Sequence, residues 1–205
     1  MFITLEGPEG SGKTSVMKEV IRRLIDEGHS IIETREPGGT EIAEQIRTII
    51  LDRKNLKLDS RAEALLYAAS RRQNLVEKIW PSIQAGHIVI CDRFIDSSLA
   101  YQGGARGIGL DEVLQINLFA TEGSFPELTL LFDIEPELGL KRIAQNKQRE
   151  VNRLDLERLD FHRQVRQTYL ALAKKYPQRI VVIDASQPLH DVIETTYAHI
   201  KKRLT

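Results

Sequence analysis

The sequence has one cysteine, no net charge and no long apolar segment. Cys91 has no second cysteine to pair with, and its apolar neighbours predict a buried thiol rather than a nucleophile. The 29 Lys and Arg residues balance 29 Asp and Glu residues, so charge does not favour a nucleic-acid polymer as partner. No run approaches the roughly 18 apolar residues of a membrane span, and no charged and apolar leader precedes the first strand-like segment. We therefore expect a cytoplasmic protein that binds neither membranes nor nucleic-acid polymers.

Five short apolar segments alternate with segments of helical periodicity. The predicted strands cover residues 1–6, 30–34, 87–92, 128–133 and 180–184. The predicted helices cover residues 14–27, 40–51, 60–80, 94–101, 111–121, 137–146, 157–175 and 188–204, with Ser60 and Asp111 as N-caps and a flexible turn at 102–109. Continuous apolar strands separated by helices are typical of a parallel sheet with both faces covered. The pattern predicts a three-layer α/β/α fold with a five-stranded parallel sheet, in a single domain of residues 1–205.

A phosphate-binding motif, G-x-x-x-x-G-K-[ST], joins the first strand to the first helix. It consists of Gly7, Pro8, Glu9, Gly10, Ser11, Gly12, Lys13 and Thr14. The glycines allow backbone N–H groups to surround phosphate oxygens, Lys13 can reach the β- and γ-phosphates, and the Thr14 hydroxyl can bind Mg²⁺. Gly28 would end the helix at its C′ position, and the helix N-terminus, which favours anions, faces the loop. The motif predicts a P-loop NTPase fold that binds a nucleoside triphosphate with Mg²⁺.

Charged residues follow the strands at the edge where open α/β sheets bind ligands. Asp92 ends the third strand and is predicted to act toward Mg²⁺. Asp133 ends the fourth strand with the same pattern, and an N-cap or surface acid is the preferred interpretation there. Several arginines at this edge favour a pocket for the phosphate of an acceptor, because guanidinium groups suit phosphate oxygens. They are Arg35, Arg47, Arg71, Arg72 and Arg93.

Two features point to a nucleobase next to that phosphate pocket. Tyr67 and Arg71 lie four residues apart, on one face of a predicted helix. Gln102 supplies an amide, and an aromatic ring with an amide can hold a base by stacking and hydrogen bonding. Tyr67 has an equally good alternative as a core residue.

The segment 147–156 is highly charged and lacks apolar periodicity. It could extend the preceding helix along the surface or form a lid, and we interpret the region around 143–156 as a small lid that does not pack into the core. Arg149 and Arg153 lie four residues apart, so a helical lid would present both on one face. The P-loop places only Glu9 beside Lys13, so an arginine from the lid would meet the charge that develops on the transferring phosphoryl group. We predict that at least one of the pair is catalytic, with Arg153 slightly favoured.

Four stretches together resemble the thymidylate kinase family. The stretch 90–102 (ICDRFIDSSLAYQ) is similar to the family signature, and 34–39 (TREPGG), 69–72 (ASRR) and 105–107 (ARG) are similar to further family motifs. The resemblance runs from the first strand to the last helix. It implies a nucleoside monophosphate kinase-like fold and phosphoryl transfer from MgATP to dTMP, which gives dTDP.

The resemblance also implies roles for individual residues. Tyr67 would stack on thymine, and Arg71 and Gln102 would hydrogen-bond the pyrimidine edge. The phosphate of dTMP would be held by Arg35, Arg47 and the catalytic Arg93. Glu9 would approach the 3′-hydroxyl of the deoxyribose, Asp92 would act through Mg²⁺, and Arg142 with residues 185–188 would bind adenine. The implied substrate-binding set is completed by Glu36, Ser98 and Tyr101.

Two further implications concern assembly and subgroup. Family members are usually homodimers, so the resemblance implies a homodimer. Some members carry a basic residue in the P-loop where this chain has Glu9. The members that lack it resemble this chain in having lid arginines, here Arg149 and Arg153.

Three other functions compete with this interpretation. A GTPase switch would need an Asn-Lys-x-Asp motif, but residues 146–149 read NKQR and no Asp-x-x-Gly occurs. A nucleotide-binding regulatory module would have the P-loop without chemistry. Another nucleoside or nucleoside monophosphate kinase would share the fold and differ in the acceptor.

Overall fold

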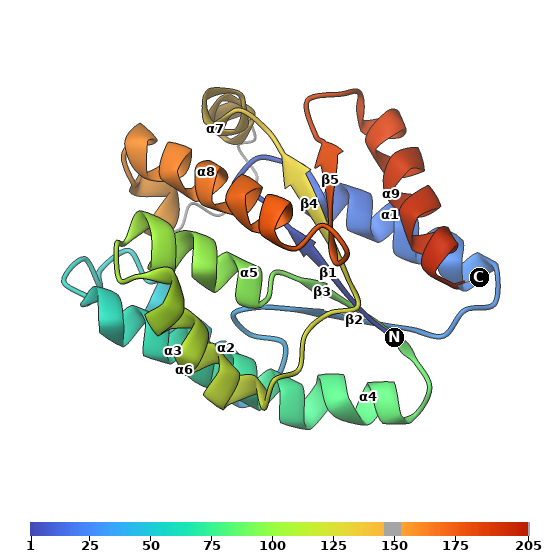
Figure 1. The fold of residues 1–205 in the computed structure, drawn as a ribbon, viewed down its shortest axis with the longest axis horizontal. Helices are drawn as coiled ribbons and strands as arrows, with labels where there is room; N and C mark the ends of the chain where they lie inside the picture. Colours follow the sequence, from blue (N-terminus) through green and yellow to red (C-terminus); the bar gives the residue numbers. More distant parts are fainter. Residues whose placement is uncertain (146–152, 205) are drawn as a thin grey trace.

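The computed structural model describes residues 1–145 and 153–204, and it confirms the five-stranded parallel sheet (Figure 1). All adjacent strands are parallel, and their order is β2-β3-β1-β4-β5. The strands are β1 (Phe2–Glu6), β2 (Ile31–Arg35), β3 (Ile88–Asp92), β4 (Leu128–Asp133) and β5 (Ile180–Asp184).

Helical elements connect the strands. The elements before β4 are α1 (Lys13–Asp26), α2 (Glu41–Leu51), α3 (Ser60–Asn74), η1 (Leu75–Ile79), α4 (Trp80–Gln84), α5 (Ile95–Ser98), η2 (Leu99–Ala105) and α6 (Leu110–Thr121). Those after β4 are α7 (Pro136–Gln145), η3 (Arg153–Leu156), α8 (Leu159–Lys175) and α9 (Leu189–Leu204). As expected from sequence, Gly28 lies just beyond the C-cap residue of α1, with φ of 89°.

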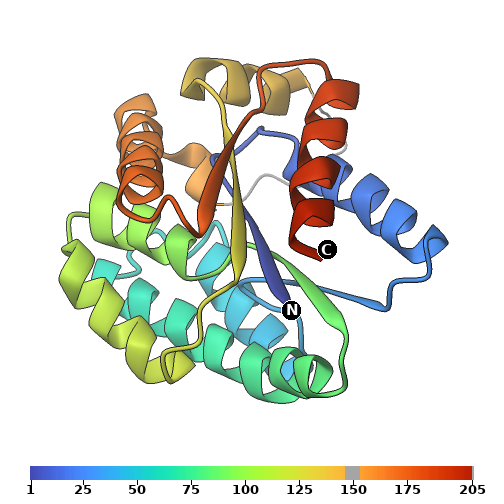
Figure 2. The same ribbon diagram turned by 45° about the vertical axis from the view of Figure 1, so that its right-hand side comes forward.

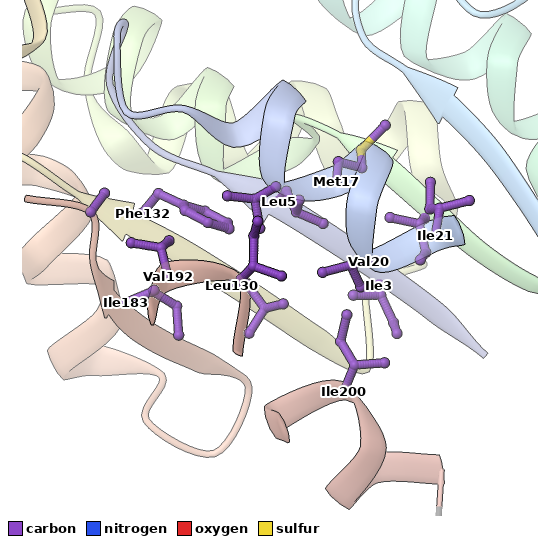
Figure 3. Packing of buried hydrophobic residues seen from close by; sticks show 14 of the residues in the cluster. Ile3, Leu5, Met17, Val20, Ile21, Leu130, Phe132, Ile183, Val192 and Ile200 are labelled. Carbon is purple, nitrogen blue, oxygen red and sulfur yellow. The ribbon is translucent and has the colours of Figure 1, made fainter. Parts of the chain in front are cut away.

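Side chains along each strand alternate between the two faces of the sheet, and each face has its own helices. Ile3 and Leu5 of β1 pack with α1 and α9, which lie side by side on one face (Figures 2 and 3). Phe2, which directly precedes Ile3 and therefore points the opposite way, packs on the other face with η1 and α5. Cys91 of β3 also faces that side and is fully buried, so the expected core thiol is confirmed.

The strand order reverses around β1, and this places the ligand edge. From β1 the chain first builds β2 and β3 on one side, and then β4 and β5 on the other. Open α/β sheets bind ligands at the carboxyl ends of strands where the order reverses. The P-loop leaves β1 at this edge, and Asp92 ends the neighbouring strand opposite Leu5.

Two expected N-cap residues are wrong, Ser60 by one position and Asp111 by two. Asp59, not Ser60, is the N-cap of α3, because its carboxylate accepts hydrogen bonds from the backbone N–H groups of Arg61 and Ala62. Helix α6 begins at Leu110, so Asp111 lies in its first turn. There its negative charge interacts favourably with the positive end of the helix dipole.

The region around Gln102 was expected to be a flexible turn, but it is helical. Residues Leu99–Ala105 form a wide helical segment, η2, that continues α5 directly. Burial explains the difference, because η2 packs on α6 and α8 and its residues Leu99–Gly103 are buried. The helical backbone of η2 therefore fixes the position of Gln102.

The expected lid is packed into the core where the structure describes it. Arg153 and Leu154 are each 6% exposed, and Leu154 joins the cluster that contains Val165 and Tyr169 of α8. The expectation that 147–156 stays outside the core is therefore wrong for 153–154. Lys147 and Arg149 lie outside the described residues. Within the described ranges, no helix is long and apolar enough to cross a bilayer.

Candidate functional site

The P-loop curves around the N-terminus of α1. Gly12 is the N-cap residue with φ of 84°, a left-handed conformation that glycine adopts without strain. The first amides of α1 therefore open toward the loop, where the helix dipole favours an anion. Thr14 is exposed in the first turn. The geometry is that of a cradle for phosphate oxygens.

Lys13 lies across this cradle. Its ammonium donates hydrogen bonds to the carbonyl oxygens of Gly7 at 3.0 Å and Pro8 at 3.3 Å, and to Ser11 Oγ at 3.4 Å. Burial and the nearby charge of Arg93 lower the pKa of Lys13 to about 8. The lysine is thus held over the loop before any phosphate arrives.

Gly139 of α7 is a site residue that the sequence analysis missed. A Cβ on Gly139 would lie 2.4 Å from the carbonyl oxygen of Glu9, and one on Gly10 would lie 2.1 Å from the carbonyl oxygen of Gly139. Backbone therefore packs directly on backbone at this point. A glycine in the middle of a predicted helix was the available signal, since it usually has a packing or functional reason.

Arg93 joins β3 to the P-loop. Its Nη2 donates to the Glu9 carboxylate at 2.8 Å, and the Tyr101 hydroxyl donates to the same carboxylate. Burial raises the pKa of Glu9, but the charges of Arg93 and Lys13 and the Tyr101 hydrogen bond outweigh it, so the net shift is downward. Arg93 also has φ of 72°, a strained conformation for a residue other than glycine, and such residues cluster at functional sites.

A buried carboxylate, Glu6, is linked to Arg93 through two hydroxyl groups that contact both side chains. It accepts hydrogen bonds from the Phe94 amide at 2.7 Å, the Ser97 hydroxyl at 2.5 Å and the Tyr169 hydroxyl at 2.9 Å. Arg93 donates to the oxygens of both Ser97 and Tyr169, at 3.2 and 3.4 Å. Burial and the nearby Asp96 raise the pKa of Glu6 from 4.5 to about 7.

Asp92 is the candidate metal ligand nearest the P-loop. Its Oδ1 is buried and has no hydrogen-bond partner among residues 1–145 and 153–204. A buried carboxylate oxygen without a partner is costly unless a cation or water satisfies it. Together with the exposed hydroxyl of Thr14, this oxygen fits the oxygen ligands that Mg²⁺ prefers. Asp133, by contrast, is paired with Arg166 at 2.7 Å, in agreement with a structural acid.

Two of the predicted base-binding residues, Tyr67 and Gln102, line a small cavity of about 20 Å³. It is lined by Tyr67, Arg93, Ser97, Tyr101, Gln102 and Leu154. One water needs about 10–15 Å³, so the cavity has room for roughly one water, and a base enters only when a lining side chain moves. Tyr67 is 8% exposed, so it belongs both to the core and to this cavity.

Arg71 lies beside the cavity but does not line it. Its Nε donates to Glu36 at 2.7 Å, and its Nη1 donates to Ser98 at 3.0 Å and to Asn117. The side chain is 1% exposed. Arg71, Glu36 and Ser98, all predicted for the substrate, therefore form one buried network.

Arg35 and Arg47 lie elsewhere along the edge. Arg35 is 55% exposed, pairs with Glu44 at 3.1 Å and lines an open hollow of about 510 Å³ beside β2. Arg47 donates to the carbonyl oxygen of Pro37 at 2.8 Å. Neither is among the residues that line the small cavity with Arg93. Arg72 pairs with Glu122 at 2.8 Å, away from the cavity.

Arg142 and the loop after β5, the two parts for which the family resemblance implies adenine binding, contact each other. Arg142 donates to the carbonyl oxygens of Ala185 at 2.9 Å and Ser186 at 3.4 Å. Because Arg142 and Gly139 share α7, this contact lies on the helix that packs against the P-loop.

Comparisons with known proteins agree with this geometry. The family model described as "Thymidylate kinase" matches residues 5–195. A thymidylate kinase from Clostridium novyi (strain NT) is 60% identical over 200 residues, which cover 98% of each chain. The chain belongs to the thymidylate kinase family. One from Geobacillus sp. (strain WCH70) is 56% identical over 99% of this chain and 97% of that one.

A solved structure supports the family assignment at the level of the fold. The crystal structure of thymidylate kinase from Ehrlichia chaffeensis superposes with a TM-score of 0.78 at 32% identity, and the match covers 98% of each chain. Family membership makes this chain an ATP-dependent phosphotransferase with a P-loop kinase fold.

The Glu6 network predicts how stability in this family member depends on pH. Because folding raises the pKa of Glu6, the folded protein holds a proton that the unfolded chain releases between pH 4.5 and about 7. Stability must therefore fall as pH rises through this window, by a few kcal/mol at most from this group. Glu6→Gln keeps the shape of the side chain, resembles the protonated acid in having both a donor and an acceptor, and removes the titration.

Urea unfolding of both proteins at pH 5, 6, 7 and 8 measures the effect. We expect the variant to lose less stability than the parent between pH 5 and pH 7. Parallel pH profiles would show that Glu6 does not titrate in this range.

Proposed function

We propose that the protein transfers the γ-phosphoryl group of ATP to dTMP, giving ADP and dTDP, with Mg²⁺ bound near Thr14 and Asp92. The observation that carries this proposal is the contact of Arg93 with Glu9. It joins the phosphate cradle of the P-loop to a cavity lined by Tyr67 and Gln102. A donor phosphate and an acceptor nucleotide would therefore meet at one arginine.

Phosphoryl transfer depends mainly on positioning and on charge stabilisation. Lys13 and the first amides of α1 would hold the β- and γ-phosphates, and Arg93 would bridge to the acceptor phosphate. Mg²⁺, when bound, would neutralise charge that develops on the phosphate oxygens. Glu9 already orients Arg93 and would also accept from the 3′-hydroxyl of dTMP.

The remaining residues would select the acceptor and the adenine. Tyr67 would stack on the base, and Gln102 and Arg71 would hydrogen-bond its edge, with Arg71 held in place by Glu36 and Ser98. Arg35 and Arg47 would hold the acceptor phosphate after leaving Glu44 and Pro37, and Tyr101 would keep Glu9 in place. Arg142 and residues 185–188 would contact adenine.

A nucleotide panel tests the activity directly. Formation of ADP should be measured with dTMP, dUMP, dCMP, AMP and thymidine as acceptors, and without acceptor. Turnover highest with dTMP is expected. Higher turnover with another monophosphate would reassign the acceptor, and ATP hydrolysis independent of every acceptor would contradict the proposal.

Lys13→Ala should lower kcat for dTMP at least about 100-fold, the effect of losing one positioned donor to a developing charge. Lys18→Ala, on the exposed side of the same helix, is the matched control and should retain parental kcat. Circular dichroism and thermal unfolding of both variants establish that they are folded. A folded Lys13→Ala protein with near-parental kcat would contradict the P-loop assignment.

We further propose that the chain is a single kinase domain with a lid at about 143–156 that supplies catalytic charge and is anchored to the core through Arg153 and Leu154. The described contacts of Arg153 are with Glu63 and with the carbonyl oxygen of Ile50, and neither belongs to the P-loop. We therefore now favour Arg149 for the transition state and Arg153 for the acceptor pocket.

Arg149→Ala should lower kcat and kcat/KM together, by up to about 10³-fold, because such an arginine acts only in the transition state. Arg153→Ala should instead mainly raise KM for dTMP. Steady-state kinetics of both single variants and of the double variant separate these effects. A double variant with kcat within threefold of the parent would leave the charge to Lys13, Arg93 and Mg²⁺.

We propose a homodimer that forms through α3 and α6. These helices contact each other (Figure 1) and expose Leu65 (56%) and Phe119 (88%), and apolar side chains gathered on a surface favour association. Phe119→Glu should therefore yield a monomer in sedimentation velocity, whereas Ile25→Glu, on α1, should not. A parent protein that sediments as a monomer at all concentrations would contradict the dimer.

A further inference from the structure

Glu63 of α3 is a buried acid for which the proposed chemistry has no role. It is fully buried, and it accepts hydrogen bonds and ion pairs from three side chains. Gln102 Nε2 donates to its Oε1 at 2.9 Å, Arg106 Nε lies 3.3 Å from the same oxygen, and Arg153 pairs with its Oε2. The donors come from η2, from the loop behind it and from η3.

Two of the three side chains that contact Glu63 are arginines. Guanidinium groups stay charged at any ordinary pH, and they donate without accepting. A carboxylate between two such groups can only accept, so the side chain that completes its shell must present an N–H. Gln102 is that side chain.

This constraint decides which way the Gln102 amide points. The oxygen and nitrogen of an amide lie on opposite sides of its carbon, so a nitrogen that faces Glu63 turns the oxygen away from it. Gln102 is 1% exposed and lines the cavity with Tyr67 and Tyr101. Its Oε1 takes part in no hydrogen bond with residues 1–145 or 153–204, so it is available to a ligand.

We propose that Glu63 is a specificity-determining residue. It orients the Gln102 amide so that the amide oxygen, a hydrogen-bond acceptor, faces the base of the nucleotide that receives the phosphoryl group. The inference rests on the proposed function, in which Gln102 binds the pyrimidine edge. Thymine and uracil carry a donor at N3–H and pair with such an oxygen. Cytosine carries an acceptor at N3, so two lone pairs would face each other and its nucleotide is rejected.

Glu63→Gln tests the mechanism because it replaces an acceptor by an amide of the same shape. Arg153 cannot accept, so it retains the oxygen of the new side chain, and the NH₂ then takes the position that faced Gln102 at 2.9 Å and Arg106 at 3.3 Å. Arg106 keeps its pair with Glu157. Gln102 must turn its own oxygen toward that NH₂, and its nitrogen then points into the cavity. The cavity then presents the N–H of Gln102, a hydrogen-bond donor that suits N3 of cytosine.

The probes are dTMP and 5-methyl-dCMP, which share the methyl group and differ only at N3 and C4. A site built to hydrogen-bond its ligand rejects the unmatched one by about 10⁴-fold, so the parent should show a large ratio of kcat/KM values. Glu63→Gln should lower this ratio at least tenfold. KM should carry the change more than kcat, and affinity for ATP, measured by calorimetry, should stay at the parental value.

Two variants separate orientation from a general loss of charge. Glu157→Gln removes a carboxylate that pairs with Arg106 at 2.7 Å and has no contact with Gln102 within the described ranges, so it should keep the parental ratio. Glu63→Asp retains an acceptor-only group and should also keep a high ratio. An equal fall of the ratio in Glu157→Gln, or a folded Glu63→Gln with the parental ratio, would overturn the proposal.

Gln102→Ala distinguishes failure of this inference from failure of the underlying function. A parental ratio in Gln102→Ala would mean that this amide does not contact the base. A collapsed ratio in Gln102→Ala, combined with a parental ratio in Glu63→Gln, would overturn only the role of Glu63. Adding Glu63→Gln to Gln102→Ala should change the ratio no further.

Should Glu63→Gln not fold, the parent protein still tests the orientation. Hydrogen exchange of the Gln102 side-chain NH₂, followed by NMR without nucleotide, should be much slower than that of exposed side-chain amides because Glu63 holds it. Exchange at the exposed rate would show that the NH₂ faces the cavity and would overturn the proposal.

Discussion

The contact between Arg93 and Glu9 is the interaction on which the rest of the site depends. It connects the end of β3 to the P-loop, and both partners are largely withdrawn from water, with exposed fractions of 20% and 5%. A charge buried in this way is costly unless it is paired and hydrogen-bonded. Ser97 and Tyr169 supply the remaining bonds to Arg93, and Glu6 holds those two hydroxyls in turn. The left-handed backbone at Arg93 is therefore maintained by several elements at once.

The sheet could be predicted closely because its signal is local. Each strand is a short apolar run that ends in a polar residue, and Asp92, Asp133 and Asp184 end the strands in the structure where the sequence suggested. The P-loop could be predicted equally well, because its motif and the strand and helix that flank it are contiguous in sequence. Cap positions were less accurate, because Asp59 and Ser60 are both good capping residues and only the backbone conformation decides between them.

The site was harder to predict because its contacts join residues far apart in the chain. Gln102 was placed in a flexible turn, since Gly103 and Gly104 suggest one, but packing on α6 and α8 makes the segment helical. Arg153 was placed in a free lid because its neighbours are charged, yet its partner Glu63 lies 90 residues earlier and gave no signal of its own.

The close approach of Gly139 to Gly10 has a consequence for how the elements around the P-loop can move. Side chains between two elements can change rotamer, but here main chain meets main chain, and neither surface can yield. Helix α7 is thereby fixed to the P-loop through Gly139, while Arg142, on the same helix, holds the carbonyl oxygens of Ala185 and Ser186. The P-loop and the segment after β5 are therefore coupled through one helix, and a displacement of either would be transmitted to the other.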